Sequence, residues 1–231
     1  MGIQENLRAV QVRLSEAARQ CGRDPAQVQL IAVSKTRPVS EILEAFQAGQ
    51  LDFGENYAQE LRDKATEISQ PLLRWHFIGS LQRNKVKYVV GRACWIHDVD
   101  HVELAGEIGK RSGTPTSILL GVNIGKEPQK SGVLPEMLWE TIENVQKIQG
   151  ISLRGLMCIP PASQDPEGAA PFFEEMAFLA SEGRKKGIPL TELSMGMSHD
   201  YPVAVRYGAT MIRVGTAIFG ARIIKTQGDD N

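Results

Sequence analysis

The sequence predicts one α/β domain over residues 1–231, a single (β/α)8 barrel with an extra helix at its N-terminus. Three observations support this fold class. Short apolar segments rich in β-branched residues alternate with amphipathic helical segments, which is the pattern of a parallel sheet. There are eight such repeats, and eight favour a closed barrel over an open sheet. The length suits one barrel, and neither a long linker nor a low-complexity segment divides the chain.

The first element is an amphipathic helix over the first 20 residues, because Ile3, Leu7, Val10 and Leu14 recur every three or four positions. We expect it to cover the bottom or the side of the barrel. Apolar runs then predict strands at residues 28–33, 51–54, 73–78, 93–97, 116–123, 153–157, 192–194 and 210–214. Apolar residues at helical spacing predict helices at 38–48, 56–68, 82–90, 102–111, 135–148, 167–185 and 201–207. The last nine residues are expected to form a flexible tail.

Composition and charge exclude several classes of protein. The 26 Lys and Arg residues balance 27 Asp and Glu, so neither nucleic acid nor an acidic membrane is expected as a partner. Three widely spaced cysteines give neither a disulfide framework nor a CxxC metal site, and they fit a reducing compartment. The N-terminus lacks a signal-peptide pattern, and no apolar run approaches the ~20 residues that span a bilayer. We therefore expect a cytoplasmic protein.

Lys35 is the sharpest candidate for a functional residue. It directly follows the first predicted strand, and in (β/α)8 barrels the functional groups lie at the C-terminal ends of the strands. A lysine that is partly desolvated there has a lowered pKa, so its neutral amine can form a Schiff base. The alternatives are a solvated surface lysine or an ion-pair partner.

Two glycine-containing loops follow the seventh and eighth strands, where barrels often bind phosphate. One carries Ser194 and Ser198, and the other carries Gly215 and Thr216. Tight turns with capping hydroxyl groups are the alternative interpretation for either loop alone. Arg213 should point into the mouth from the eighth strand, where it would bind a phosphate or a ring nitrogen, or pair with a carboxylate such as that of Glu55.

The histidines do not predict a metal site, because they show no ligand spacing with cysteine or aspartate. His76 lies inside the third strand, and a hydrogen-bonded core histidine is the ordinary reading of that position. A lysine, a phosphate cradle and a polar mouth together fit a phosphorylated aldehyde as cofactor.

Several motifs make the chain resemble the pyridoxal phosphate (PLP) homeostasis protein family over about residues 3–222. They occur in order at residues 32–36 (AVSKT), 53–57 (FGENY), 76–85 (HFIGSLQRNK), 130–132 (KSG), 154–157 (RGLM), 194–198 (SMGMS) and 213–220 (RVGTAIFG). The resemblance implies a fold-type III PLP barrel. It also implies that Lys35 forms a covalent aldimine with pyridoxal 5'-phosphate.

The same resemblance assigns the other cofactor-binding residues. Arg213 would face the pyridine nitrogen, keep it unprotonated and so make the cofactor a weaker electron sink. Asn56 and His76 would line the ring pocket. The phosphate would be bound by Ser198, Gly215 and Thr216, together with Ser194 or nearby amides.

The resemblance favours a carrier or buffer of PLP in vitamin B6 and amino-acid homeostasis, without robust catalysis. Fold-type III racemases and decarboxylases have a second β domain, whereas this sequence ends soon after the barrel motifs. A racemase also needs a second base besides Lys35, for which Tyr57 and Tyr201 are the substitutes. A weak PLP-dependent racemase or decarboxylase is the alternative, and a PLP-free Schiff-base aldolase is a third hypothesis. The candidate partners are apo forms of PLP-dependent enzymes or a regulatory protein, and we expect a monomer.

Overall fold

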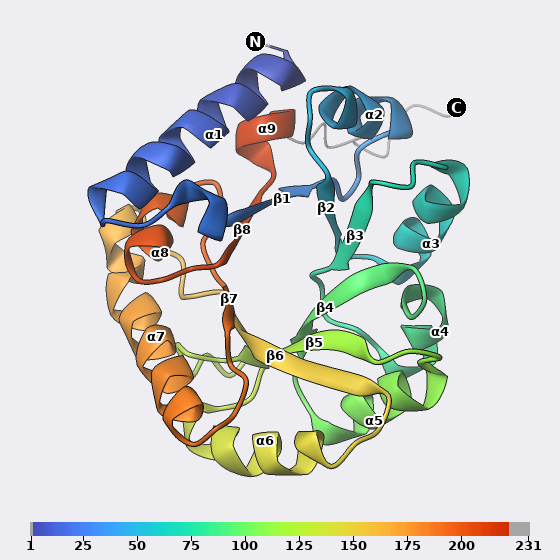
Figure 1. Cartoon of the computed structure of the whole chain (residues 1–231), viewed down its shortest axis with the longest axis vertical. Coiled ribbons are helices and arrows are strands. Elements are labelled where there is room, and N and C mark those ends of the chain that lie inside the picture. The colour runs from blue at the N-terminus through green and yellow to red at the C-terminus, as the bar shows by residue number, and fades with distance from the viewer. Residues whose placement is uncertain (1, 222–231) are drawn as a thin grey trace, which may run out of the picture.

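A computed structural model describes residues 2–221 and shows eight parallel strands closed into a barrel, with helices forming an outer ring (Figure 1). The strands follow one another in sequence order, and β1 closes the barrel by pairing with β8. Their bounds are β1 Gln29–Val33, β2 Asp52–Glu55, β3 Arg74–Phe77, β4 Ala93–Val99, β5 Thr116–Val122, β6 Ile151–Cys158, β7 Glu192–Ser194 and β8 Met211–Val214.

The helices lie between the strands along the chain and pack on the outside of the sheet. They are α1 Ile3–Gln20, α2 Val39–Gln47, α3 Ala58–Glu67, α4 Val86–Val89, α5 Val102–Arg111, α6 Leu138–Gln146, α7 Ala170–Lys185, α8 Tyr201–Arg206 and α9 Thr216–Phe219. Short 3-10 helices occur at Pro25–Gln27, Arg83–Lys85, Pro135–Met137 and Pro166–Ala169. The predicted (β/α)8 barrel with an extra N-terminal helix is therefore confirmed.

Two apolar clusters hold the barrel together. The larger one fills the space between the outer face of the sheet and the helices. The smaller one joins Ile31, Leu119, Met157 and Met211 from four different strands, with Trp95 packed against it. Side chains from β1, β5, β6 and β8 can meet only inside the barrel, so this cluster is part of its interior core. Much of the remaining interior is polar, which is unusual because branched apolar residues normally dominate there.

Helix α1 covers the side of the barrel, which is one of the two positions expected for it from the sequence. It lies along α8 and α9 (Figure 1). Its buried face consists of Leu7, Val10 and Leu14, as the helical spacing predicted. The Asn6 side chain adds a hydrogen bond to the carbonyl oxygen of Ile218 at 2.9 Å, which ties α1 to α9.

Among the strands, the predicted boundaries differ by two residues at the start of β6 and at the end of β4. The prediction ended β4 at residue 97, whereas it continues to Val99. The polar residue Asp98 interrupts the apolar run in the sequence, but its carboxyl group is buried and hydrogen-bonded to Ser131. Burial raises the pKa of Asp98 to about 6. The helix predicted at 82–90 is instead a 3-10 turn followed by the single turn α4.

The C-terminal tail predicted for the last nine residues lies outside the described residues. Within residues 2–221, no helix combines the length and apolar character needed to cross a membrane. No group of three or more His, Cys, Asp or Glu side chains in this part of the chain could hold a metal ion.

Candidate functional site

Lys35 lies in a turn directly after β1, at the C-terminal mouth of the barrel, and is partly buried. The next residue, Thr36, has a φ of 62°, a left-handed conformation that costs energy for a residue with a branched Cβ. The Thr36 amide donates a hydrogen bond of 2.6 Å to Glu60 Oε1. This bond stabilises the strained turn and therefore fixes the backbone next to Lys35.

A buried ionic cluster supports the same turn from the outer side of the sheet. Glu55 Oε1 accepts hydrogen bonds from Ser34 Oγ at 2.6 Å and from Lys64 Nζ at 2.8 Å. Lys64 also donates to the Ser34 carbonyl oxygen and to Glu60 Oε1, both at 2.7 Å. Burial raises the pKa of Glu55 to about 7, although the Lys64 ammonium acts in the opposite direction. Glu55 is therefore the partner of Lys64, and the structure does not support its pairing with Arg213.

The loops after β7 and β8 face each other at the mouth, as predicted. The amides of Gly215 and Ala217 donate to Ser198 Oγ, at 3.2 and 3.4 Å. The β7 loop turns at Gly196, whose φ of 91° suits glycine and whose added Cβ would lie 2.6 Å from Ala204 Cβ. The two amides are directed at the Ser198 oxygen, whose hydroxyl can still donate, and the Thr216 hydroxyl follows at the start of α9. Such a donor set suits a phosphate.

Arg213 points inward from β8 and is only 3% exposed. Its Nη1 donates to Ser194 Oγ at 2.6 Å and its Nη2 donates to the Cys158 carbonyl oxygen at 2.9 Å. Burial lowers the pKa of Arg213, opposed by Asp200 and Asp98 through space. The Ser194 hydroxyl is therefore occupied in orienting Arg213, and its contact with a phosphate stays a prediction.

His76 is fully buried, and both of its ring nitrogens have protein partners. Nε2 lies 3.0 Å from Asp52 Oδ1, and Nδ1 lies 3.0 Å from His97 Nε2. His97 Nδ1 in turn lies 2.9 Å from Ser194 Oγ. The sequence pattern singled out His76 but indicated neither Asp52 nor His97 as its partner. His97 lies between His76 and Ser194, so a direct contact of His76 with a cofactor ring stays a prediction.

Asn56 follows β2 at the mouth. Its Oδ1 is buried and has no hydrogen-bond partner among the described residues. The neighbouring Gly79 allows a very close approach, because a Cβ on it would lie 2.4 Å from the Asn56 carbonyl oxygen. A buried acceptor without a partner is costly, so this atom suits a donor group of a bound molecule.

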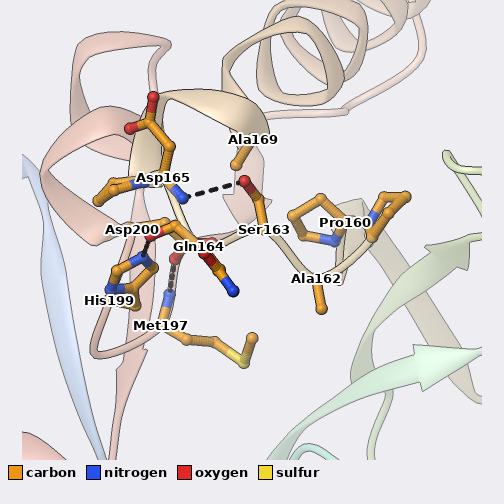
Figure 2. Close-up of a pocket in the computed structure, with 11 residues that line it drawn as sticks. Pro160, Ala162, Ser163, Gln164, Asp165, Ala169, Met197, His199 and Asp200 are labelled. Carbon is orange, nitrogen blue, oxygen red and sulfur yellow. Dashed lines mark hydrogen bonds between the residues drawn. The ribbon is translucent and has the colours of Figure 1, made fainter.

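A cavity of about 460 Å³ adjoins the β7 loop (Figure 2). It lies between residues 160–169, which follow β6, and Met197, His199 and Asp200 of the β7 loop. The His199 imidazole, bonded to the Gln164 carbonyl oxygen at 3.0 Å, links the two segments. The cavity thus shares the β7 loop with the proposed phosphate site.

The loop after β5 is hydrogen-bonded to the segment that follows the neighbouring strand β6. Lys130 Nζ donates to the carbonyl oxygens of Ile159 and Pro160, at 3.4 and 3.1 Å, and forms an ion pair with Glu127. These contacts link the loop to the segment that follows β6.

The comparisons with known proteins agree with the fold. Residues 6–223 match the family model described as alanine racemase, N-terminal domain, which defines the class of barrel. The alanine racemase of Corynebacterium glutamicum shares the fold, with a TM-score of 0.67 and 14% identity over 95% of this chain and 62% of that chain.

More similar relatives define the family. Proteins named pyridoxal phosphate homeostasis protein are 40% identical in Vibrio cholerae, over 95% of this chain and 96% of that protein, and 41% identical in Escherichia coli, over 95% and 97%. The structure of PipY of Synechococcus elongatus with PLP bound has a TM-score of 0.82 and 37% identity, covering 94% of this chain and all of that chain. The chain belongs to the pyridoxal phosphate homeostasis protein family.

Proposed function

We propose that the protein binds pyridoxal 5'-phosphate through a covalent bond to Lys35 and acts in PLP (vitamin B6) and amino-acid homeostasis as a carrier or buffer. The observation that carries this proposal is the convergence of Lys35, the Ser198–Gly215 donor set and Arg213 on one barrel mouth. The names of the relatives and the PLP-bound structure of PipY support it. When bound, PLP supplies an aldehyde that condenses reversibly with amines and a ring that acts as an electron sink.

Each end of the cofactor has suitable groups in this chain. Ser198, Gly215 and Thr216 would bind the phosphate through hydroxyl and amide donors. The buried guanidinium of Arg213 would donate to the ring nitrogen. Asn56 would offer its unpartnered Oδ1 to a donor on the ring.

The charge of Arg213 favours storage over catalysis. A guanidinium keeps its protons at neutral pH, so an acceptor nitrogen facing it would stay unprotonated. An unprotonated ring withdraws electrons less strongly, and carbanion chemistry on it is slower. This supports a protein that holds the cofactor without using it efficiently.

The tyrosines also support this assignment. A racemase needs a second base on the face of the substrate opposite the lysine. Tyr201 is 1% exposed and packs under the Arg13 guanidinium, 5.5 Å from the ring centre, on the α1 side of the barrel. It therefore lies in the outer core and is unsuited to that role. Tyr57, which follows β2 and is 56% exposed, is then the tyrosine left as a candidate for the second base.

Alanine turnover distinguishes the carrier from a weak racemase or decarboxylase. The PLP-loaded protein is incubated with L-alanine, and D-alanine and released CO2 are measured beside Lys35→Ala. We expect no steady turnover above the Lys35→Ala level. Sustained turnover that depends on Lys35 and is reduced by Tyr57→Phe would establish the enzyme instead.

The carrier role makes its own prediction. Loaded protein should activate an apo PLP-dependent enzyme in the presence of a scavenger for free PLP. Activation no faster than by free PLP under the same conditions would contradict delivery.

A PLP-free Schiff-base aldolase would instead be trapped by borohydride only after a carbonyl substrate is added. Light scattering during gel filtration checks the expected monomer, alone and with an apo enzyme or a regulatory protein added.

A further inference from the structure

A continuous row of buried polar side chains crosses the inside of the barrel. It links Arg213 to Ser194 at 2.6 Å, Ser194 to His97 at 2.9 Å, His97 to His76 at 3.0 Å, and His76 to Asp52 at 3.0 Å. We call these five residues the barrel chain. They come from β8, β7, β4, β3 and β2, and each is at most 5% exposed.

The barrel chain runs from the mouth toward the opposite end of the barrel. Arg213 is next to the last residue of β8, whereas Asp52 is the first residue of β2. Asp52 is held there by Arg74, whose Nε and Nη2 donate to its two carboxylate oxygens at 2.7 and 2.6 Å. Arg74 is half exposed, so the chain ends at an ion pair in contact with solvent.

When both imidazoles are neutral, only one arrangement of protons satisfies every link. Burial opposes ionisation of Asp52, but hydrogen bonds from His76 and Arg74 outweigh it and hold the pKa of this carboxyl well below its ordinary value. An ionised Asp52 can only accept, so His76 must carry its proton on Nε2 and accept at Nδ1.

The same reasoning continues toward the mouth. Burial lowers the pKa values of His76 and His97, so both imidazoles are neutral. His97 must donate from Nε2 to His76 and accept at Nδ1 from the Ser194 hydroxyl. Ser194 then has only its acceptor function left, and Arg213 Nη1 supplies the donor. Every donor in the barrel chain therefore points toward Asp52.

Burial of five polar groups in a barrel interior is not explained by stability alone. Apolar side chains of similar size would fill the same space without desolvating charges, and such replacements are often neutral or stabilising. The barrel chain instead gives the guanidinium a fixed orientation and connects it, through aligned neutral dipoles, to a carboxylate at a distance. A carboxylate placed beside Arg213 would compete with a ring nitrogen for its N–H groups.

We propose that the barrel chain holds Arg213 as a fixed hydrogen-bond donor at the mouth, with Asp52, His76 and His97 as positioning residues for the cofactor ring. The orientation of Arg213 is a property of the cofactor-free protein. Its effect on the cofactor rests on the proposed function.

The first test uses the cofactor-free protein and ¹⁵N-resolved NMR. Both imidazoles should be neutral and protonated at Nε2 only, and the Arg213 Nη–H signals should be resolved because the group cannot rotate freely. Ser194→Ala should remove the resolved Arg213 signals, and Ser194→Thr, which keeps the hydroxyl, should retain them. A charged or Nδ1-protonated His76, or unchanged Arg213 signals in Ser194→Ala, would overturn the proposal.

The second test measures PLP affinity and the visible spectrum of Asp52→Asn beside Arg74→Met. Both variants break the ion pair at the far end, but only Asp52→Asn removes the carboxylate of the barrel chain. Asp52→Asn should bind PLP about tenfold more weakly, the effect of one weakened charged hydrogen bond, with an altered absorption band. Arg74→Met should stay within about twofold of the unchanged protein.

The outcomes separate the two proposals. Equal affinities and spectra for Asp52→Asn and the unchanged protein would refute the positioning role while leaving PLP binding intact. An unchanged protein that fails to bind PLP would refute the proposed function, and the NMR measurement would still decide the orientation of Arg213. If Asp52→Asn does not fold, Ser194→Ala against Ser194→Thr gives the same comparison at the other end of the barrel chain.

Discussion

Replacement of Glu55 by glutamine should change how stability depends on pH. The Glu55 carboxyl is fully buried, and burial raises its pKa from 4.5 to about 7 despite the Lys64 ammonium at 2.8 Å. Because its folded-state pKa lies above the unfolded value, the folded protein binds this proton more tightly. The stabilising contribution is therefore fully present below pH 4.5 and is lost as the pH rises through 7.

The pKa change sets the size of the effect. A rise in the pKa of Glu55 from 4.5 to about 7 contributes roughly 3 kcal/mol to the free energy of unfolding at low pH. Roughly 2–3 kcal/mol of this contribution is lost between pH 5 and pH 8. Glutamine keeps a carbonyl acceptor for Ser34 and Lys64 but cannot ionise. Relative to the unchanged protein, the free energy of unfolding of Glu55→Gln should thus be roughly 2–3 kcal/mol larger at pH 8 than at pH 5.

Urea unfolding of the cofactor-free proteins at the two pH values and equal ionic strength measures this difference. Glu60→Gln is the matched control, since Glu60 contacts the same ammonium but is 21% exposed on its side chain. Its stability relative to the unchanged protein should vary much less between the two pH values. Parallel pH profiles for Glu55→Gln and the unchanged protein would refute the reasoning.

Two further substitutions test the surroundings of the site. Gly79→Ala should weaken PLP binding by about tenfold with an unchanged far-ultraviolet circular dichroism spectrum, because its Cβ would lie 2.4 Å from the Asn56 carbonyl oxygen and displace that segment. Gly113→Ala, with no atom within 4 Å of the added Cβ, is the control, and equal titration curves for both variants would contradict the prediction. Lys64→Met should lower the free energy of urea unfolding by about 3–5 kcal/mol, because it removes the ammonium that binds Glu55, Glu60 and the Ser34 carbonyl oxygen. Lys147→Met removes an exposed pair and should cost under about 1 kcal/mol, and a similar small loss for Lys64→Met would show that its cluster is not important for stability.

The fold was predictable because each strand is a short apolar run and each helix has a local apolar face. The strands of the structure lie within one or two residues of their predicted ends. The mouth residues were also predictable, since Lys35, Ser198, Arg213 and Gly215 need only the rule that strands of a barrel end at one face. The end of β4 was misjudged because the buried carboxyl group of Asp98 breaks the local apolar pattern.

The barrel chain could not be predicted from the sequence, because which of its side chains meet depends on the register between neighbouring strands. His76 lies beside Gly54 and Trp95, and the β3–β4 pairing shifts between Trp75 and His76. That irregularity brings His97 against His76, and nothing local in the sequence indicates it. Lys64 was missed for a similar reason, since a charged residue on an amphipathic helix is ordinarily assigned to the solvent face, whereas here it is 7% exposed.

The central claim is that Lys35 binds PLP covalently at the barrel mouth. The most direct test is the visible absorption spectrum of the purified protein with added PLP, beside Lys35→Ala and the control Lys85→Ala, which alters a lysine near Asn56 and Tyr57. We predict a yellow protein for the unchanged chain and for Lys85→Ala, and a colourless Lys35→Ala. A protein that stays colourless with PLP, or a Lys35→Ala variant with the full absorption band, would contradict the account.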